Sequence, residues 1–138
     1  MKRDARLHGL SSEHHHALVL ARTLVEREGT WTGDDGAALG ERFDAELEPH
    51  FCTEDELLLP ALRLAGAAAL AARTADDHAF LRGQVELARA GDGDAARAFA
   101  ARLAEHVRFE ERELFPACEA LVPDGVLDEV ARRAPPHR

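Results

Sequence analysis

Apolar residues recur at spacings of three and four along four long stretches of the chain, as expected of amphipathic helices with one buried face. Glycine or proline follows each stretch, and these residues often end helices. The pattern predicts helices over about 10–28, 34–66, 67–90 and 94–121, and a short helix over about 124–133. Because short turns join the long helices, we expect an all-α fold, an antiparallel up-down-up-down four-helix bundle with a short C-terminal helix.

The starts of the first two helices carry residues typical of helix caps. Ser11 is placed to cap the first helix, and Glu13 adds a negative charge to its first turn. Asp34 or Asp35 is placed to cap the second helix. Pro49 lies inside this second stretch, where its missing N–H should kink a helix. The sequence equally allows two consecutive helices that meet at Pro49.

Two segments, HFCTEDELLLPA at 50–61 and HVRFEERELFPA at 106–117, repeat one another. They agree at His50/His106, Glu54/Glu110, Leu58/Leu114, Pro60/Pro116 and Ala61/Ala117, and an acidic residue follows each shared glutamate. The His and Glu of each copy are four residues apart, so on a helix they share one face, about 40° apart. That face is otherwise apolar, and a carboxylate inside it is costly unless a cation compensates its charge. The repeat therefore predicts a metal site between helices.

The first and third helices each contribute one inward histidine. Of His14, His15 and His16, His14 lies near the middle of the apolar stripe, and His15 at its edge is the second choice. On the third helix, apolar residues follow His78 at the same three spacings as they follow His14. An acidic residue also directly precedes each of the two. We therefore expect His14 and His78 to face the interior of the bundle.

The inward polar residues of the four helices form one set of possible metal donors. The set consists of His14, His50, Glu54, His78, His106 and Glu110. Four imidazoles and two carboxylates without a thiolate suit a pair of first-row metal ions, with iron or manganese favoured over structural zinc. Two six-coordinate ions need about 12 donor positions and this set supplies about 8, which leaves room for an oxo or hydroxo bridge, water or dioxygen.

Composition narrows the class of protein. The 138 residues, of which 46% are hydrophobic and 31% charged, suffice for one domain over 1–138 with its own core. A net charge of −9 without a basic face argues against a nucleic-acid partner. No stretch resembles a signal peptide or a bilayer span, so we expect no membrane association and a cytoplasmic location.

The remaining cysteines and histidines have simpler interpretations. Cys52 and Cys118 fit reduced thiols. Cys52 lies either near the site or, as we favour, serves as small buried filler. His8 and His137 stand in polar surroundings and are expected in solvent.

Four segments resemble the hemerythrin-like family, also called HHE cation-binding domains. They are EHHHALVLARTL, HFCTEDELLLP, DDHAFL and HVRFEERELFP, which together span nearly the whole chain. The resemblance implies a four-helix bundle with a non-haem di-iron centre that binds or senses dioxygen, nitric oxide or iron. It also implies His14, His50, Glu54, His78, His106 and Glu110 as the ligands, with the two glutamates as bridges.

The chain departs from the oxygen carriers of that family at the third helix. The carriers have two ligand histidines there, four residues apart, whereas Thr74 and Arg82 flank His78 at this spacing. An additional open position would make iron more reactive and reversible oxygen carriage less assured. Glu113 is predicted to point inward, either as a third carboxylate ligand or, as we favour, as a partner for Arg82.

Three functions are compatible with this sequence. The first is a binding module whose di-iron centre binds a small diatomic molecule or reports iron and oxygen status. The second is a di-iron enzyme with ferroxidase, peroxidase or nitric oxide reductase chemistry, although the absence of tyrosine argues against a tyrosyl-radical oxidase. The third is a metal-free helical interaction protein with a buried polar network. The sequence does not indicate the oligomeric state or a protein partner.

Overall fold

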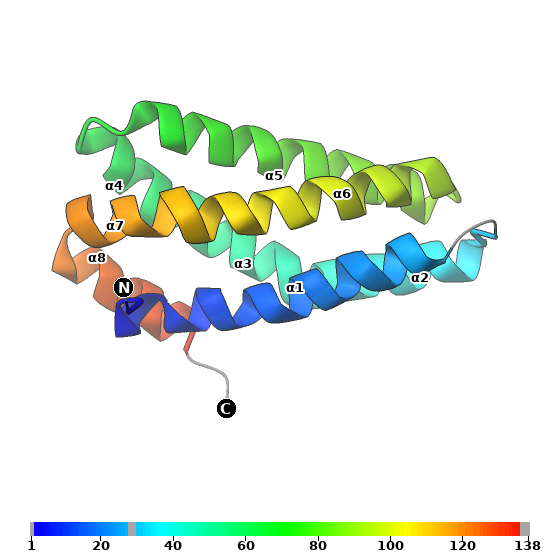
Figure 1. Ribbon diagram of the computed structural model, residues 1–138, viewed down its shortest axis with the longest axis horizontal. Coiled ribbons are helices and arrows are strands. Elements are labelled where there is room, and N and C mark those ends of the chain that lie inside the picture. The colour runs from blue at the N-terminus through cyan, green and yellow to red at the C-terminus, as the bar shows by residue number, and fades with distance from the viewer. Residues whose placement is uncertain (1, 28–29, 136–138) are drawn as a thin grey trace.

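The computed structural model describes residues 2–27 and 30–135, and every regular element in these two ranges is helical (Figure 1). The first long helix, α1 (His8–Glu26), follows a short 3-10 turn, η1 (Ala5–Leu7). The third predicted stretch forms α5 (Ala68–Arg89). The predicted end of the first helix at residues 28 and 29 lies outside the described residues, and so does His137.

The second and fourth predicted stretches are runs of helical turns without a break, and each contains π-helical segments. The second run consists of α2 (Gly33–Arg42), η2 (Phe43–Leu47), α3 (Glu48–Thr53), η3 (Glu54–Leu58) and α4 (Leu59–Leu64). The fourth consists of α6 (Gly93–Phe109), η4 (Glu110–Leu114) and α7 (Phe115–Leu121). The predicted short C-terminal helix is α8 (Asp124–Arg133).

Each π-helical segment ends just before a proline. The residue preceding the proline donates its backbone N–H to the carbonyl five positions back, as Leu59 does to Glu54 before Pro60. Proline has no N–H and its ring collides with the carbonyl of an α-helical turn, so a wider turn accommodates it. Helical structure therefore continues through Pro49, which favours one helical run over two helices that meet there.

Two of the predicted caps are wrong. Thr32 caps α2: its side chain accepts from the backbone N–H of Asp35, whose carboxylate accepts in return from the backbone N–H of Thr32. Ser11 lies inside α1, because η1 and α1 begin earlier than the apolar pattern indicated. Its hydroxyl donates to the Glu111 carboxylate instead. His8 is half-buried, with Nε2 at 3.1 Å from the backbone carbonyl oxygen of Arg3, so the prediction of a solvated side chain is also wrong.

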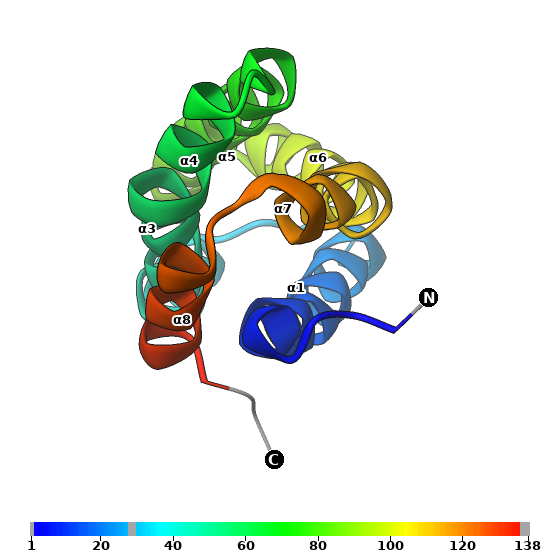
Figure 2. The same ribbon diagram turned by 90° about the vertical axis from the view of Figure 1, so that its left-hand side faces the viewer.

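The helices pack side by side around a shared interior. Helix α6 contacts both α1 and α5, and α5 also contacts α2 and α4 (Figure 1). Helix α8 packs against η1 and η3 at the end of the molecule nearest the viewer in Figure 2. This arrangement is consistent with a hemerythrin bundle. Within the described chain, no helix combines the length and apolarity that a bilayer crossing requires.

The apolar core consists of two clusters. One contains Phe43, Phe51 and Phe99 with the aliphatic residues around them, and the other is centred on Leu10, Leu58, Leu114 and Phe115. In each long helical run the buried histidine lies close to the point where residues of one cluster give way to residues of the other. The site is therefore a polar layer that crosses an otherwise apolar interior.

Candidate metal centre

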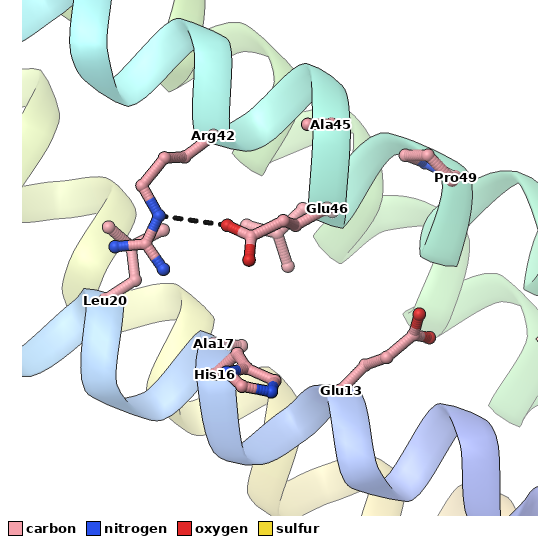
Figure 3. Close-up of a pocket in the computed structure, with 9 residues that line it drawn as sticks. Glu13, His16, Ala17, Leu20, Arg42, Ala45, Glu46 and Pro49 are labelled. Atoms are coloured by element: carbon pink, nitrogen blue, oxygen red, sulfur yellow. Dashed lines mark hydrogen bonds and ion pairs between the residues drawn. The ribbon is translucent and has the colours of Figure 1, made fainter. Parts of the chain in front are cut away.

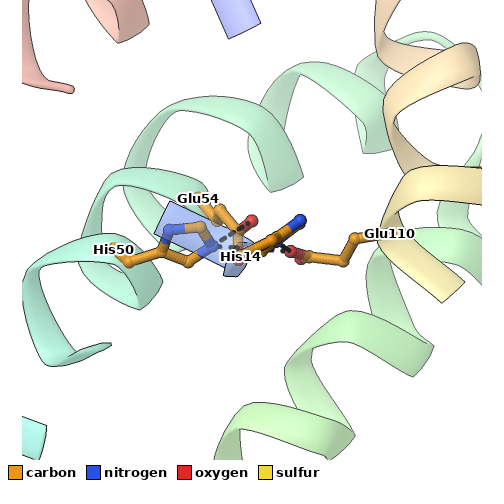
Figure 4. A group of neighbouring side chains, drawn as sticks. All are labelled: His14, His50, Glu54 and Glu110. Atoms are coloured by element: carbon orange, nitrogen blue, oxygen red, sulfur yellow. Dashed lines mark hydrogen bonds and ion pairs between the residues drawn. The ribbon is translucent and has the colours of Figure 1, made fainter. Parts of the chain in front are cut away.

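All six predicted site residues are buried, and the structure brings them together. They are His14, His50, Glu54, His78, His106 and Glu110, none of which exposes more than 5% of its surface. They form two groups of four, and within each group the potential ligand atoms all lie within 4.8 Å of one another. The first group contains His14, His50, Glu54 and Glu110 (Figure 4), and the second contains Glu54, His78, His106 and Glu110. The two glutamates thus belong to both groups.

Glu110 connects three histidines through its two oxygens. Its Oε1 lies 2.8 Å from Nε2 of His14 and 3.5 Å from Nε2 of His50. Its Oε2 lies 3.2 Å from Nε2 of His106. One carboxylate therefore reaches imidazoles of both groups.

Glu54 spans the two groups in the same way. Its Oε2 lies 3.1 Å from Nε2 of His50, and its Oε1 lies 3.0 Å from Nε2 of His78. A carboxylate whose two oxygens face different imidazole pairs has the geometry needed to bridge two cations.

The local structure around both glutamates explains one wrong prediction. Glu54 and Glu110 are the first residues of π-helical segments η3 and η4, so the helix widens directly after them. A π-helical turn holds more residues than an α-helical one, and positions further along rotate relative to an ideal α-helix. Glu113, expected to point inward, is exposed, whereas Leu114 and Phe115 are fully buried. Glu113 is therefore not a third buried ligand, and Arg82 pairs with Glu48 and Asp55 instead.

Each imidazole has a second carboxylate partner at its outer nitrogen, Nδ1. The pairs are His14–Glu111 at 2.6 Å, His50–Glu13 at 2.9 Å, His78–Asp55 at 2.7 Å and His106–Asp77 at 2.8 Å. A carboxylate only accepts hydrogen bonds, so Nδ1 is the donor in each pair. Sequence reasoning did not place these four acids in the site. A signal was available, because each acid directly precedes or follows a predicted ligand.

Charge dominates the protonation of this cluster. Burial alone would lower the pKa of His106, but Coulomb attraction to Glu110 and the hydrogen bond to Asp77 raise it to about 10. Burial likewise opposes charge on His14, His50 and His78, yet their carboxylate neighbours raise the pKa of each ring. The neighbouring carboxylates thus favour the protonated form of all four imidazoles when no metal is bound.

The pKa values of Glu110 and Glu111 shift in the opposite direction. Burial would raise the pKa of Glu110, but the positive charge of His106, followed by the hydrogen bond with His14, holds it well below its usual range. Despite burial, the hydrogen bonds from His14 and Ser11 lower the pKa of Glu111 to about 2. Protons on the imidazoles compensate the same negative charges that metal cations would compensate.

Four buried polar atoms within the described chain make no hydrogen bond, and three of them belong to the site: Glu54 Oε2, Glu110 Oε2 and His106 Nε2. The fourth, Arg3 Nε, lies on a residue outside the two groups. The three site atoms do lie at ion-pair distances, with Glu110 Oε2 3.2 Å from His106 Nε2, but the orientation is not that of a hydrogen bond. Buried polar atoms without a partner are uncommon and call for a specific explanation. All three atoms belong to residues of the two four-residue groups, and their donor types are those that bind iron, manganese or zinc.

Aromatic rings cover the imidazoles. The ring of Phe51 stacks on His78 with centroids 4.1 Å apart, and Phe115 stacks on His14 at 5.3 Å. Both phenylalanines are almost completely buried. These rings exclude water from one face of each imidazole and restrict its rotation.

The other candidate residues lie outside the two groups. His15 and His16 are exposed, so His15 is not an alternative to His14. Cys52 is half-buried, and its thiol donates to Glu48; it is therefore not fully buried filler. Thr74, one of the two residues four positions from His78, is fully buried and donates its hydroxyl to the Leu70 carbonyl.

A cavity of about 130 Å³ lies beside the site, between α1 and the segment from α2 to α3 (Figure 3). Ala17 and Leu20 form part of its apolar wall, and Arg42 donates a hydrogen bond to Glu46 across its rim. Glu13 also lines the cavity and accepts from Nδ1 of His50. Glu13 therefore connects the cavity to His50, an imidazole of the candidate metal centre.

Comparison with protein families gives the domain type. Residues 5–118 match the model of the hemerythrin HHE cation-binding domain, and this range includes all six buried site residues. The chain belongs to the hemerythrin family. The matched range of this hemerythrin HHE domain ends before α8, which packs against the bundle as an addition to it. No curated protein and no solved structure matches the chain.

Proposed function

We propose that this hemerythrin HHE domain holds two iron ions, one among His14, His50 and the shared glutamates and one among His78, His106 and the same glutamates. The observation that supports the proposal is the pair of buried four-residue groups that share Glu54 and Glu110. The proposal includes the antiparallel up-down-up-down topology, in which four neighbouring helices bring one histidine each to the same depth.

A di-iron centre would supply exchangeable coordination positions and reversible redox chemistry. The chain itself supplies four imidazoles through Nε2, two carboxylates that span both positions, and aromatic rings that limit access of water. This set fills about 8 of the roughly 12 positions of two six-coordinate ions. We therefore propose that the domain binds or senses dioxygen, nitric oxide or iron.

An enzymatic function is the second candidate, and Thr74 is the observation that favours it. Its hydroxyl donates to the Leu70 carbonyl, and Arg82, the other residue four positions from His78, pairs with Glu48 and Asp55. Neither residue therefore replaces the additional histidine of the oxygen carriers. One fewer protein donor leaves more positions for exchangeable ligands. Repeated turnover of peroxide or nitric oxide that is abolished in Glu110→Ala would favour an enzyme over a binding module.

Metal analysis of protein purified from iron-supplied cells tests the metal proposal. We expect about two iron ions per chain in the natural sequence and a clear loss in His106→Ala, since each group has only four protein residues. His15→Ala is the matched control, because His15 is exposed and lies beside a proposed ligand. An iron content equal to that of the His106→Ala protein would contradict the proposal.

Spectroscopy of the iron-loaded protein tests the small-molecule proposal. Dioxygen, nitric oxide and azide should each change the absorption bands of the centre, because each would occupy an exchangeable position. A spectrum that none of the three alters would show that iron is bound without access to ligands.

A further inference from the structure

The outer hydrogen bonds of the imidazoles connect different helices in a regular order. Glu13 precedes His14 on α1, but its carboxylate accepts from Nδ1 of His50 on α3. Asp77 precedes His78 on α5, but its carboxylate accepts from Nδ1 of His106 on α6. In both cases the acid contacts the histidine of the neighbouring helix and not the one beside it in sequence.

The acids that follow the two shared glutamates repeat this crossed pattern. Asp55, next to Glu54, accepts from His78 on α5. Glu111, next to Glu110, accepts from His14 on α1. The four hydrogen bonds therefore join α1 to α3, η3 to α5, α5 to α6, and η4 back to α1, which closes a ring around the site.

Three of the four acids are held from their outer side by arginine. The pairs are Arg82–Asp55 at 3.0 Å, Arg102–Asp77 at 3.3 Å and Arg3–Glu111 at 3.3 Å. In all three the arginine contacts one oxygen of the carboxylate and the histidine contacts the other. A carboxylate fixed at both oxygens has little freedom to rotate, so it also fixes the imidazole that donates to it.

We propose that Glu13, Asp55, Asp77 and Glu111 are positioning residues that hold each imidazole with Nδ1 outward and Nε2 toward the proposed metal positions. Because a carboxylate accepts only, Nδ1 keeps its hydrogen, and Nε2 is the nitrogen that would release its proton to bind a cation. This ring of hydrogen bonds orients the four imidazoles before a metal binds. The effect of the hydrogen bonds on metal affinity rests on the proposed function, whereas the orientation of the imidazoles does not.

Imidazole NMR of the metal-free protein tests the crossed pattern directly. We expect a slowly exchanging Nδ1–H signal from each of the four buried histidines. Asp77→Ala should remove or shift the signal of His106 and leave that of His78 in place, although His78 is the sequence neighbour. Asp76→Ala, an exposed acid beside Asp77 on the same helix, is the matched control and should change neither signal. Loss of the His78 signal instead, or no change at His106, would overturn the proposal.

Metal affinity gives a second readout. It should not change if Asp77 serves only to stabilise the fold. Removal of an outer partner typically weakens metal binding about 10- to 100-fold, and we expect this from Asp77→Ala in a zinc competition titration with a chelator. Two zinc ions should still bind at saturation. Asp77→Asn should fall between Asp77→Ala and the natural sequence, since its amide oxygen accepts the same hydrogen bond without the charge.

The two readouts separate the possible failures. Circular dichroism shows whether Asp77→Ala folds. If it does not, Asp77→Asn is used for the test instead, because it preserves the size and the hydrogen bond of the side chain. An Asp77→Ala affinity within twofold of the natural sequence would refute a positioning role. If the natural sequence binds no zinc or iron, the proposed function fails, and the NMR experiment still decides whether the crossed ring exists.

Discussion

Glu54 and Glu110 have no exposed surface, although a buried carboxylate is among the most costly groups in a protein interior. Four imidazoles surround them, and the outer acids in turn compensate those imidazoles. The result is a set of alternating charges in which each group depends on its neighbours. Removal of one shared glutamate should therefore affect both proposed metal positions at once.

Glu110→Gln tests this dependence, with Glu113→Gln as its control. We expect Glu110→Gln to lose most of both metal ions and to lower the free energy of unfolding of the metal-free protein by about 3 kcal/mol, because it leaves buried imidazoles without a counter-charge. Glu113→Gln should change neither quantity, because Glu113 is exposed, although it lies only three residues from Glu110. Metal analysis and urea denaturation measure both effects. Retention of two metals in Glu110→Gln would show that the carboxylate is not shared.

At the scale of helices, the sequence predicts well which face of a helix is buried. It predicts poorly where α-helical turns change to π-helical ones. Spacings of three and four correctly predicted that His14, His50, His78 and His106 are buried, because these histidines and the core residues occupy one stripe of each helix. The same rule failed at Glu113, because it assumes α-helical geometry and η4 is π-helical. Proline at 116 indicates a disturbance but does not specify whether the helix kinks, breaks or widens.

The outer acids were missed for a different reason. Their positions beside the predicted ligands were visible in the sequence, but the histidine that each acid contacts depends on how neighbouring helices are rotated. A single helix pattern suggests a local pair, whereas Asp77 in fact contacts His106 across the α5–α6 interface. To predict which acid pairs with which histidine, one must know how the helices of the whole bundle pack against one another.

The capping box of α2 gives a prediction for an element far from the charged layer. Thr32→Ala removes the hydroxyl that accepts from the Asp35 backbone N–H, and we expect a loss of about 1 kcal/mol in the free energy of unfolding. Thr30→Ala, in the loop just before it, is exposed and should have an effect near zero. Thermal or urea denaturation of the metal-free forms measures the difference. Metal content should be the same in both variants, and a lower content in Thr32→Ala would indicate that α2 also positions the site.

The whole molecule combines two apolar clusters with a charged layer between them. The clusters contain the large core residues, and the helices that carry them contact one another along the bundle. Folding should therefore not require metal. The charged layer nevertheless makes stability sensitive to whichever cations occupy it, protons or metal ions.

Removal of metal separates a metal-binding domain from a metal-free interaction protein. We expect a chelated, metal-depleted sample to keep nearly all of its helix signal in circular dichroism, because both apolar clusters and the outer hydrogen bonds persist. Its free energy of unfolding should fall, since a ligand present at about 100 times its Kd stabilises the folded state by about 2.7 kcal/mol. Addition of iron or zinc should restore the loss, and His106→Ala should show a much smaller recovery. Equal thermal stability of the depleted and reloaded samples would instead favour a buried polar network that functions without metal.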